Sequence, residues 1–360
     1  MADLFDYLNW RGDLSFSAVK LGCADALILS SLAYLNLEGI VPFDARTAVA
    51  LHEVNRVFSQ LPDRESRVRI KRDLSLLDAV ARSARFSGCR LCCYRSKLIT
   101  SEQTQFAAVT FLLPDGSAFV AFRGTDYSLV GWKEDFNMSF STSVPAQREA
   151  AYYVRDIAKF LPVVLHIGGH SKGGNLAVYA AAMSSLAVQN RIAGIYNLDG
   201  PGFTKHMLTH PGYLQIVPRI RTFVPESSII GILLEHKEPY TVIHSRQVGI
   251  LQHEPYSWEI MAGGFLLAEE MSAGSRFADR AIRGWLEDMP YQERCEFADA
   301  IYDLLRAGGA TNVGDILQPK SIRAILQKLT TNEQTRKLLQ EEFSDLMIAA
   351  VAAIRQQPGK

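Results

Sequence analysis

The sequence has no excess of charge of either sign, no long uncharged apolar run and no basic leader. Its 38 Lys and Arg residues are balanced by 38 Asp and Glu residues, so no basic surface indicates nucleic acid as a partner. No uncharged apolar stretch approaches the length needed to cross a bilayer. The opening residues are acidic and lack the basic and then apolar pattern of a signal peptide. We therefore expect neither a nucleic-acid partner nor a transmembrane segment.

Cysteine is also scarce. The five cysteines are an odd number without the spacing of a disulfide framework, which predicts a reducing, cytoplasmic location. Cys89, Cys92 and Cys93 resemble half a zinc site, yet no second pair lies within ordinary spacing. On a strand, the two-residue period would place Cys89 and Cys93 on one face and Cys92 on the other, so the three could not converge on one ion. We expect packed thiols, no metal and no cofactor.

What the chain does contain is a G-x-S-x-G pattern between a predicted strand and a predicted helix. An apolar, β-branched run at 163–168 leads into Gly169-His170-Ser171-Lys172-Gly173, and a run rich in Ala, Val and Leu follows. This order is typical of a nucleophile elbow, in which Gly169 and Gly173 remove side chains that would collide with the strand or the helix. The alternative is a Gly-rich turn without chemistry. The context favours Ser171 as a nucleophile.

Strands and helices alternate over the middle of the chain. Three strands are predicted at 89–100, 106–113 and 117–122, the last two forming a hairpin, and two more at 192–198 and 219–224. We expect an α/β-hydrolase fold, of class α/β, with a mostly parallel central sheet flanked by helices. Helical additions are expected at both ends. The boundaries predicted are an N-terminal helical lead-in at 1–88, a hydrolase core at 89–260 and a C-terminal helical region at 261–360.

A nucleophilic serine needs a base and an orienting acid, which follow it in the order acid, then histidine, in this fold. His253 begins a loop after an apolar run and is the preferred base, with His244 next. Asp199 ends the strand after the elbow helix and is the preferred acid, with Glu226 as the alternative. A turn-capping aspartate before glycine is the competing interpretation of Asp199.

The remaining histidines are expected to have other roles. His210 and His236 lie in polar segments and should be solvated, whereas His166 should be a hydrogen-bonded core residue. His170 should point beneath the elbow. An oxyanion hole needs two aimed donors, and we expect the amide of Lys172 and either the amide or the hydroxyl of Thr125.

Several motifs resemble known families. Phe122-Arg123-Gly124-Thr125, with Trp132 and Asp135 behind it, resembles the oxyanion segment of class 3, fungal-type lipases, and residues 169–174 resemble their elbow. The segment 198–203 is similar to the acid loop of pancreatic-type lipases, in which the aspartate belongs to the triad. The whole length, including residues 5–13 and 252–258, resembles the bacterial Mbeg-like proteins. These resemblances imply a lipase-like hydrolase.

Two residues depart from the lipase pattern. Lys172 replaces the usual apolar residue beside the nucleophile and would place a charge near the pocket. Ser228 stands where the lipase acid would follow the next strand, which favours Asp199 over Glu226.

The function expected is that of a serine hydrolase, a lipase-like esterase that cleaves carboxylic esters through an acyl-enzyme. The substrate would be a small-molecule or lipid ester, and the acyl chain and oligomeric state are left open. A catalytically silent hydrolase-fold scaffold, and a thioesterase or peptidase with the same triad, are the alternatives.

Overall fold

The computed structural model describes residues 2–126, 128–316 and 318–355, and its centre is a sheet. Within these residues the sheet has eight strands in the spatial order of the chain, β1 to β8. Pairings from β1 to β4 are antiparallel, and those from β4 to β8 are parallel. The strands are β1 Val49–Ala50, β2 Arg90–Ile99, β3 Thr104–Leu112, β4 Ala118–Phe122, β5 Leu165–His170, β6 Ile192–Leu198, β7 Ile220–Pro225 and β8 Tyr240–Ile243.

The central strands are buried on both faces, which is why their sequences are nearly continuous apolar runs. β4 is buried at every residue, and β6 is buried at every residue but one. β3 and β4 form the expected hairpin, with Gly116 at a φ of 85° in its turn. The strand expected at 192–198 has the observed bounds of β6.

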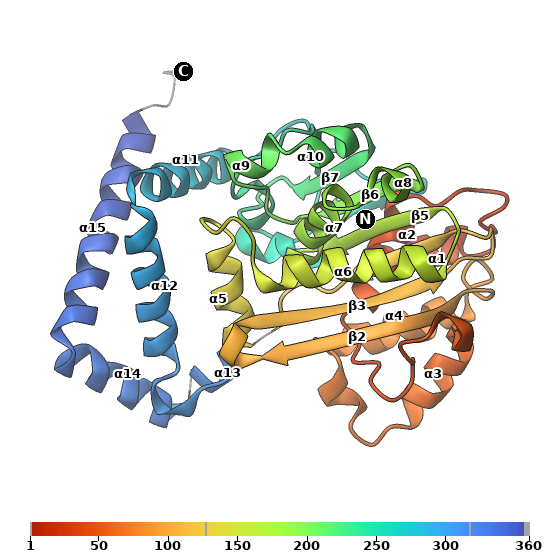
Figure 1. Ribbon diagram of the computed structural model, residues 1–360, viewed down its shortest axis with the longest axis horizontal. Helices are drawn as coiled ribbons and strands as arrows, with labels where there is room; N and C mark the ends of the chain where they lie inside the picture. Colours follow the sequence, from red (N-terminus) through yellow and green to blue (C-terminus); the bar gives the residue numbers. More distant parts are fainter. Residues whose placement is uncertain (1, 127, 317, 356–360) are drawn as a thin grey trace.

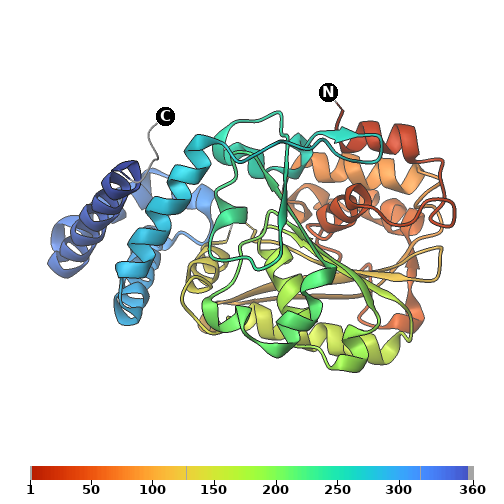
Figure 2. The same ribbon diagram turned by 90° about the horizontal axis from the view of Figure 1, so that it is seen from above.

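Helices cover both faces of the sheet, as Figures 1 and 2 show. N-terminal helices pack with β-strand side chains in one apolar cluster, and α6, α7 and α10 pack in a second cluster on the other face. This layering confirms the predicted α/β class, with a mostly parallel central sheet flanked by helices. The helices are α1 Leu4–Arg11, α2 Cys23–Leu32, α3 Leu51–Gln60, α4 Lys71–Arg82, α5 Leu129–Asn137, α6 Pro145–Phe160, α7 Lys172–Ala182, α8 Leu186–Gln189, α9 Lys205–Leu208 and α10 Pro211–Ile216.

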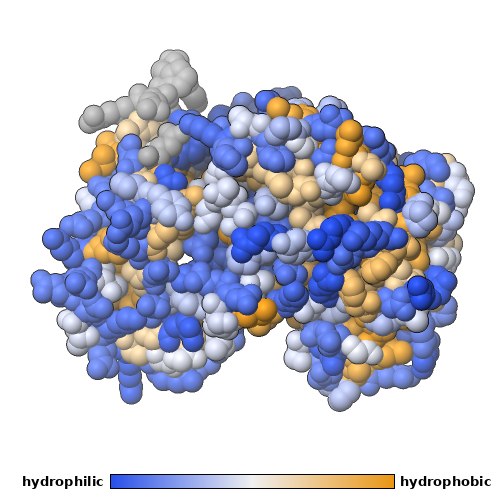
Figure 3. All heavy atoms as spheres, viewed as in Figure 1, coloured by the Kyte–Doolittle hydropathy of each residue, from blue (hydrophilic) through white to orange (hydrophobic). Residues whose placement is uncertain are grey.

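The C-terminal part is mainly helical and lies beside the sheet rather than on it (Figure 2). A two-stranded hairpin, β9 Ile260–Met261 and β10 Gly264–Phe265, precedes it. Its helices are α11 Ala273–Asp288, α12 Tyr291–Leu305, α13 Val313–Ile316, α14 Pro319–Thr331 and α15 Glu333–Arg355. Hydrophilic residues cover most of its surface on the face seen in Figure 3. The boundaries at 88 and 260 stay predictions.

α12 packs against α5 and so connects the C-terminal helical part to the rest of the molecule. Leu129 and Val130 of α5 pack with Tyr302 of α12 in a small apolar cluster. Lys133 of α5 forms an ion pair of 2.6 Å with Asp299. None of the helices in the described parts of the chain is both long and apolar enough to cross a membrane.

β2, which contains Cys92 and Cys93 and follows Cys89, departs from simple alternation. The pairing of β2 with β3 shifts between Cys92 and Arg95, and Cys93 has a φ of 57°. This bulge puts Cys92 and Cys93 in the same apolar cluster, while Cys89 lies in the cluster on the other face. The expected split of Cys89 and Cys93 from Cys92 was therefore wrong. Over the described residues, no group of three His, Cys, Asp or Glu side chains converges in a way that could hold a metal ion.

Candidate active site

Ser171 lies on the turn that joins the end of β5 to the start of α7. Its backbone has a φ of 59° and a ψ of −135°, a combination that is strained for a residue with a side chain. A Cβ on Gly169 would lie 2.3 Å from the backbone of Gly173, and a Cβ on Gly173 would lie 2.2 Å from the carbonyl oxygen of Phe122. Both positions therefore require glycine for the turn to close against α7 and β4.

Asp199 and His253 form a close pair beside this turn. Oδ2 of Asp199 lies 2.6 Å from Nδ1 of His253, and the carboxylate is fully buried. The hydroxyl of Ser228 donates to the other oxygen, Oδ1, at 2.5 Å. The carboxylate thus has a partner on each oxygen, and the imidazole has its Nδ1 fixed, which leaves Nε2 as its other polar atom.

Backbone contacts hold Ser171 close to this pair. The amide of Ser171 donates to the carbonyl oxygen of Leu198, the residue before Asp199, at 2.9 Å. The ring of His170 lies 4.6 Å from the ring of His253, centroid to centroid. In the parts of the chain that the structure describes, the hydroxyl of Ser171 makes no hydrogen bond. Such bonds are often long in ligand-free enzymes and tighten when substrate binds.

The alternative acid and the alternative base pair with each other. Nδ1 of His244 lies 3.2 Å from Oε2 of Glu226, and both side chains are partly exposed. No hydrogen bond or ion pair joins Glu226 or His244 to Ser171, Asp199 or His253 in the described residues. The geometry thus separates the two carboxylate–imidazole pairs, and the pair next to the elbow is Asp199 with His253.

Two expectations for the other histidines were wrong. The side chain of His236 is 4% exposed rather than solvated, and its ring contacts Glu238 at 3.1 Å and the carbonyl oxygen of Gly231 at 2.9 Å. Nδ1 of His166 is buried without a hydrogen-bond partner among the described residues. His210 accepts a bond from the amide of Gly212 and caps α10.

The two backbone amides expected to be oxyanion donors have no acceptor among the described residues. Neither the amide of Lys172 nor that of Thr125 donates a hydrogen bond to another described residue. A Cβ on Gly124 would lie 3.0 Å from Cβ of Ser171, so the loop that carries Thr125 packs directly against Ser171. The hydroxyl of Thr125 donates to Oδ2 of Asp135 at 2.5 Å. This contact occupies the hydroxyl and leaves the amide as the free donor of Thr125.

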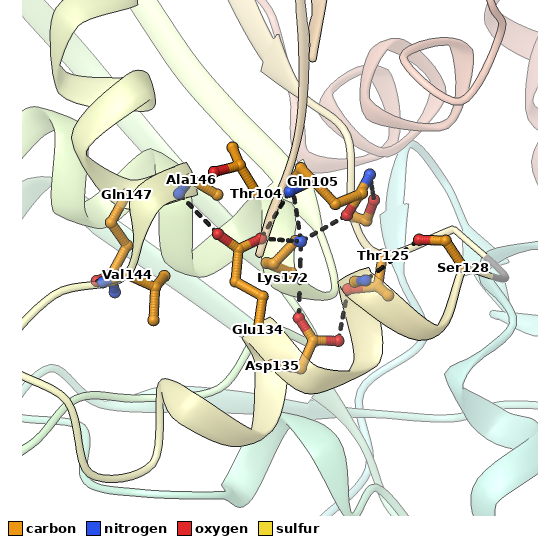
Figure 4. Close-up of polar contacts among 12 residues, drawn as sticks. Thr104, Gln105, Thr125, Ser128, Glu134, Asp135, Val144, Ala146, Gln147 and Lys172 are labelled. Atoms are coloured by element: carbon orange, nitrogen blue, oxygen red, sulfur yellow. Dashed lines mark hydrogen bonds and ion pairs between the residues drawn. The ribbon is translucent and has the colours of Figure 1, made fainter. Parts of the chain in front are cut away.

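The charge of Lys172 does not face an open pocket, contrary to expectation. Its side chain is 1% exposed, and Nζ forms an ion pair of 2.9 Å with Oε2 of the fully buried Glu134 on α5 (Figure 4). Sequence spacing gives no signal for this pairing, because the two residues lie 38 positions apart.

A second set of polar contacts holds the loop that begins at His253, called the base loop below. These contacts were not predicted from the sequence. Nε2 of His170 lies 2.8 Å from the carbonyl oxygen of His253, and Nδ1 lies 3.0 Å from the hydroxyl of Tyr34. Arg69 stacks over the ring of Tyr34 and binds both oxygens of Glu254, the residue after His253. Burial, with the nearby His253 and Arg69, holds the pKa of His170 well below its usual value. His170 is therefore neutral and serves as a link between elbow and base loop.

Comparisons with known proteins found a family model and solved structures to which the chain is similar. A model of the Mbeg1-like family matches residues 80–303. A lipase of Rhizomucor miehei, solved with its propeptide, is similar at 19% identity and a TM-score of 0.33, over 46% of this chain and 58% of that one. The M37 lipase is similar at 11% identity and a TM-score of 0.36, over 91% of this chain and 98% of that one. The comparison with curated proteins gives no match. Because the family match extends over more than half of its length, the chain belongs to the Mbeg1-like family.

Proposed function

We propose that the protein is a serine hydrolase that cleaves carboxylic esters through an acyl-enzyme. The observation that carries the proposal is the contact of 2.6 Å between Asp199 and His253, next to a serine held at a φ of 59°. A strained nucleophile, an oriented imidazole and two free amides are the parts that acyl transfer needs.

The reaction would proceed in two halves. The hydroxyl oxygen of Ser171 attacks the ester carbonyl while Nε2 of His253 takes its proton, and Asp199 stabilises the imidazolium. The amides of Lys172 and Thr125 donate to the oxyanion of the tetrahedral intermediate. Collapse expels the alcohol, which receives the proton from His253. Water, activated by the same imidazole, then releases the acid and restores Ser171.

Thioesters and peptides could use the same groups, and a silent scaffold would retain the fold alone. The polar contacts that orient Asp199 and His253 support the enzyme, because a scaffold has no need of them. The five free thiols support a reducing compartment, as in the cytoplasm.

Labelling by a fluorophosphonate probe tests this proposal. We expect the wild-type protein to be labelled on Ser171 and to hydrolyse an activated ester such as a p-nitrophenyl acetate. The Ser171→Ala variant should do neither, and Ser59→Ala, which removes an exposed hydroxyl on α3, should behave as the wild type. A folded wild-type protein that is neither labelled nor active would leave the scaffold as the better account.

A further inference from the structure

The buried cation behind the elbow has more partners than the ion pair with Glu134. Nζ of Lys172 also donates to the carbonyl oxygen of Gln105 at 2.9 Å and to the side-chain oxygen of the same residue. These three acceptors use all three protons of the ammonium. A buried ion pair is often no more stable than well-packed apolar residues of similar volume. Its position beside the nucleophile therefore suggests a role other than stability.

The contacts of Glu134 connect the ammonium to three elements. Oε2 of Glu134 accepts from the amide of Gln105 in β3 at 3.1 Å, and Oε1 accepts from the amide of Ala146 at the start of α6 at 2.8 Å. Lys172 itself is the first residue of α7. The pair thus fixes α5, which carries Glu134, against β3, α6 and α7.

The neighbouring residue on α5 extends these contacts to the oxyanion loop. Oδ1 of Asp135 faces Nζ of Lys172 at 3.8 Å, and Oδ2 accepts from the hydroxyl of Thr125 (Figure 4). Within the described residues, Oδ1 is buried and has no hydrogen bond, so the ammonium is the cation that compensates it. The side chain of Lys172 therefore reaches, through one carboxylate, the loop that carries the second oxyanion donor.

We propose that Lys172 is a positioning residue that couples the two halves of the oxyanion hole. Its amide is one donor, and its ammonium, acting through Glu134 and Asp135, holds the loop that presents the amide of Thr125. This inference rests on the proposed hydrolase function and deepens it.

The state of Asp135 provides a readout that a purely structural role would not change. The side chain of Asp135 is 37% exposed, but its Oδ1 is buried. Loss of solvation raises the pKa of Asp135 to about 6, and the charge of Lys172 opposes this rise, whereas Glu134 and Asp126 add to it. Without the ammonium the carboxyl group should keep its proton to higher pH. A protonated Asp135 no longer binds the hydroxyl of Thr125 as an ionised acceptor, so the loop should loosen at a higher pH than in the wild type.

The test uses a variant in which both buried charges are removed together. Lys172→Met alone would leave Glu134 buried and unpaired, a loss that can prevent folding. The double variant Lys172→Met, Glu134→Gln avoids this, since glutamine keeps an acceptor for the amide of Ala146. Tyr213→Phe is the matched control, because it removes a buried hydrogen bond of 2.6 Å to Glu238 away from the oxyanion loop.

Three measurements on each protein decide the proposal: the rate of fluorophosphonate labelling between pH 5 and 9, amide hydrogen exchange of peptides over residues 123–126, and the melting temperature. For the double variant we expect labelling to slow by about 100-fold, as for a misplaced catalytic group. The lost charge of Lys172 raises the pKa of Asp135 and the lost charge of Glu134 lowers it, and the effect of Lys172 is the larger of the two. We therefore still expect the acid limb of the double variant to move to higher pH, and exchange at 123–126 to accelerate. The control should lose stability without these changes.

The proposal is overturned if the double variant labels at a rate within about threefold of the wild-type rate, with an unshifted pH profile and unchanged exchange. A threefold difference is well below the usual cost of losing one oxyanion donor. A wild-type protein that does not label would count against the hydrolase function. The exchange comparison would then decide on Lys172 by itself. Faster exchange confined to 123–126 supports positioning, and unchanged exchange contradicts it.

Discussion

At the scale of the residue, two positions of the candidate site have a strained backbone. Ser171 and Asp199 both have positive φ, 59° and 55°, although neither is a glycine. Each such conformation costs about 1–3 kcal/mol and persists only where the surroundings impose it. The backbone conformation of Ser171 is imposed by the close approach of Gly169 to Gly173. That of Asp199 is imposed by its bonds to Phe223, Ser228 and His253. Strain at two proposed catalytic positions leads to a stability prediction.

Ser171→Gly should be more stable than Ser171→Ala. Glycine relieves strain of about 1–3 kcal/mol and costs about 0.5–1 kcal/mol in chain entropy, so the expected difference is about 1 kcal/mol. Urea unfolding of both variants measures it, and both should be inactive. If the alanine variant is the more stable, the turn at Ser171 is not strained.

The two candidate acids should differ greatly when neutralised. Asp199→Asn should lower turnover by about 10⁴, because the asparagine no longer holds the imidazole tautomer or stabilises the imidazolium. Glu226→Gln should lose far less, since the carboxylate of Glu226 pairs with the partly exposed His244 and, among the described residues, has no bond to His253. Single-turnover acylation by an activated ester, beside a melting curve, gives the ranking. The reverse ranking would move the acid to Glu226 and make Asp199 a turn residue.

At the scale of the element, the elbow depends on β4, β5 and α7 approaching closely. Gly173→Val should reduce both soluble yield and activity, because its Cβ would lie 2.2 Å from the carbonyl oxygen of Phe122. Gly274→Ala in α11 is the control, since its Cβ would meet nothing nearer than Ser272 Oγ at 4.0 Å. Yield and melting temperature of the two variants test the point. A normal melting curve with full activity for Gly173→Val would show that the turn is not closed in this way.

The link between elbow and base loop should depend on pH through His170. Its folded-state pKa lies below the unfolded value of about 6.5, so the stability it contributes is present above that pH and is lost as the pH falls. His170→Gln should therefore be less stable than the wild type at pH 7, yet lose less stability between pH 7 and pH 5. Melting temperatures of the wild type and of His170→Gln, measured across this pH range, provide the comparison. The effects of groups that titrate in both proteins cancel in the difference. Parallel curves would mean that His170 does not titrate in this way.

At the scale of the whole molecule, the sequence predicted features set by local patterns. The hairpin of β3 and β4, the strand β6 and the strand–turn–helix around Ser171 follow from short-range apolar periodicity and glycine placement. Contacts between segments that are distant in the chain have no such local pattern in the sequence. The pairing of Lys172 with Glu134 and that of His236 with Glu238 depend on packing that neither segment determines alone, and the bulge at Cys93 depends on its strand partner. The sequence interpretation was weakest at these buried polar groups.

The most direct test of the account is the trapping of an acyl-enzyme in a single turnover. The wild-type protein, mixed with a slight excess of an activated ester, should gain the mass of one acyl group, and digestion should locate it on the peptide that contains Ser171. The rate of this gain should fall by about 10⁴ in Asp199→Asn, and Ser171→Ala should gain no mass. An acyl group on another residue, or an equal gain of mass by folded Ser171→Ala, would contradict the proposed nucleophile.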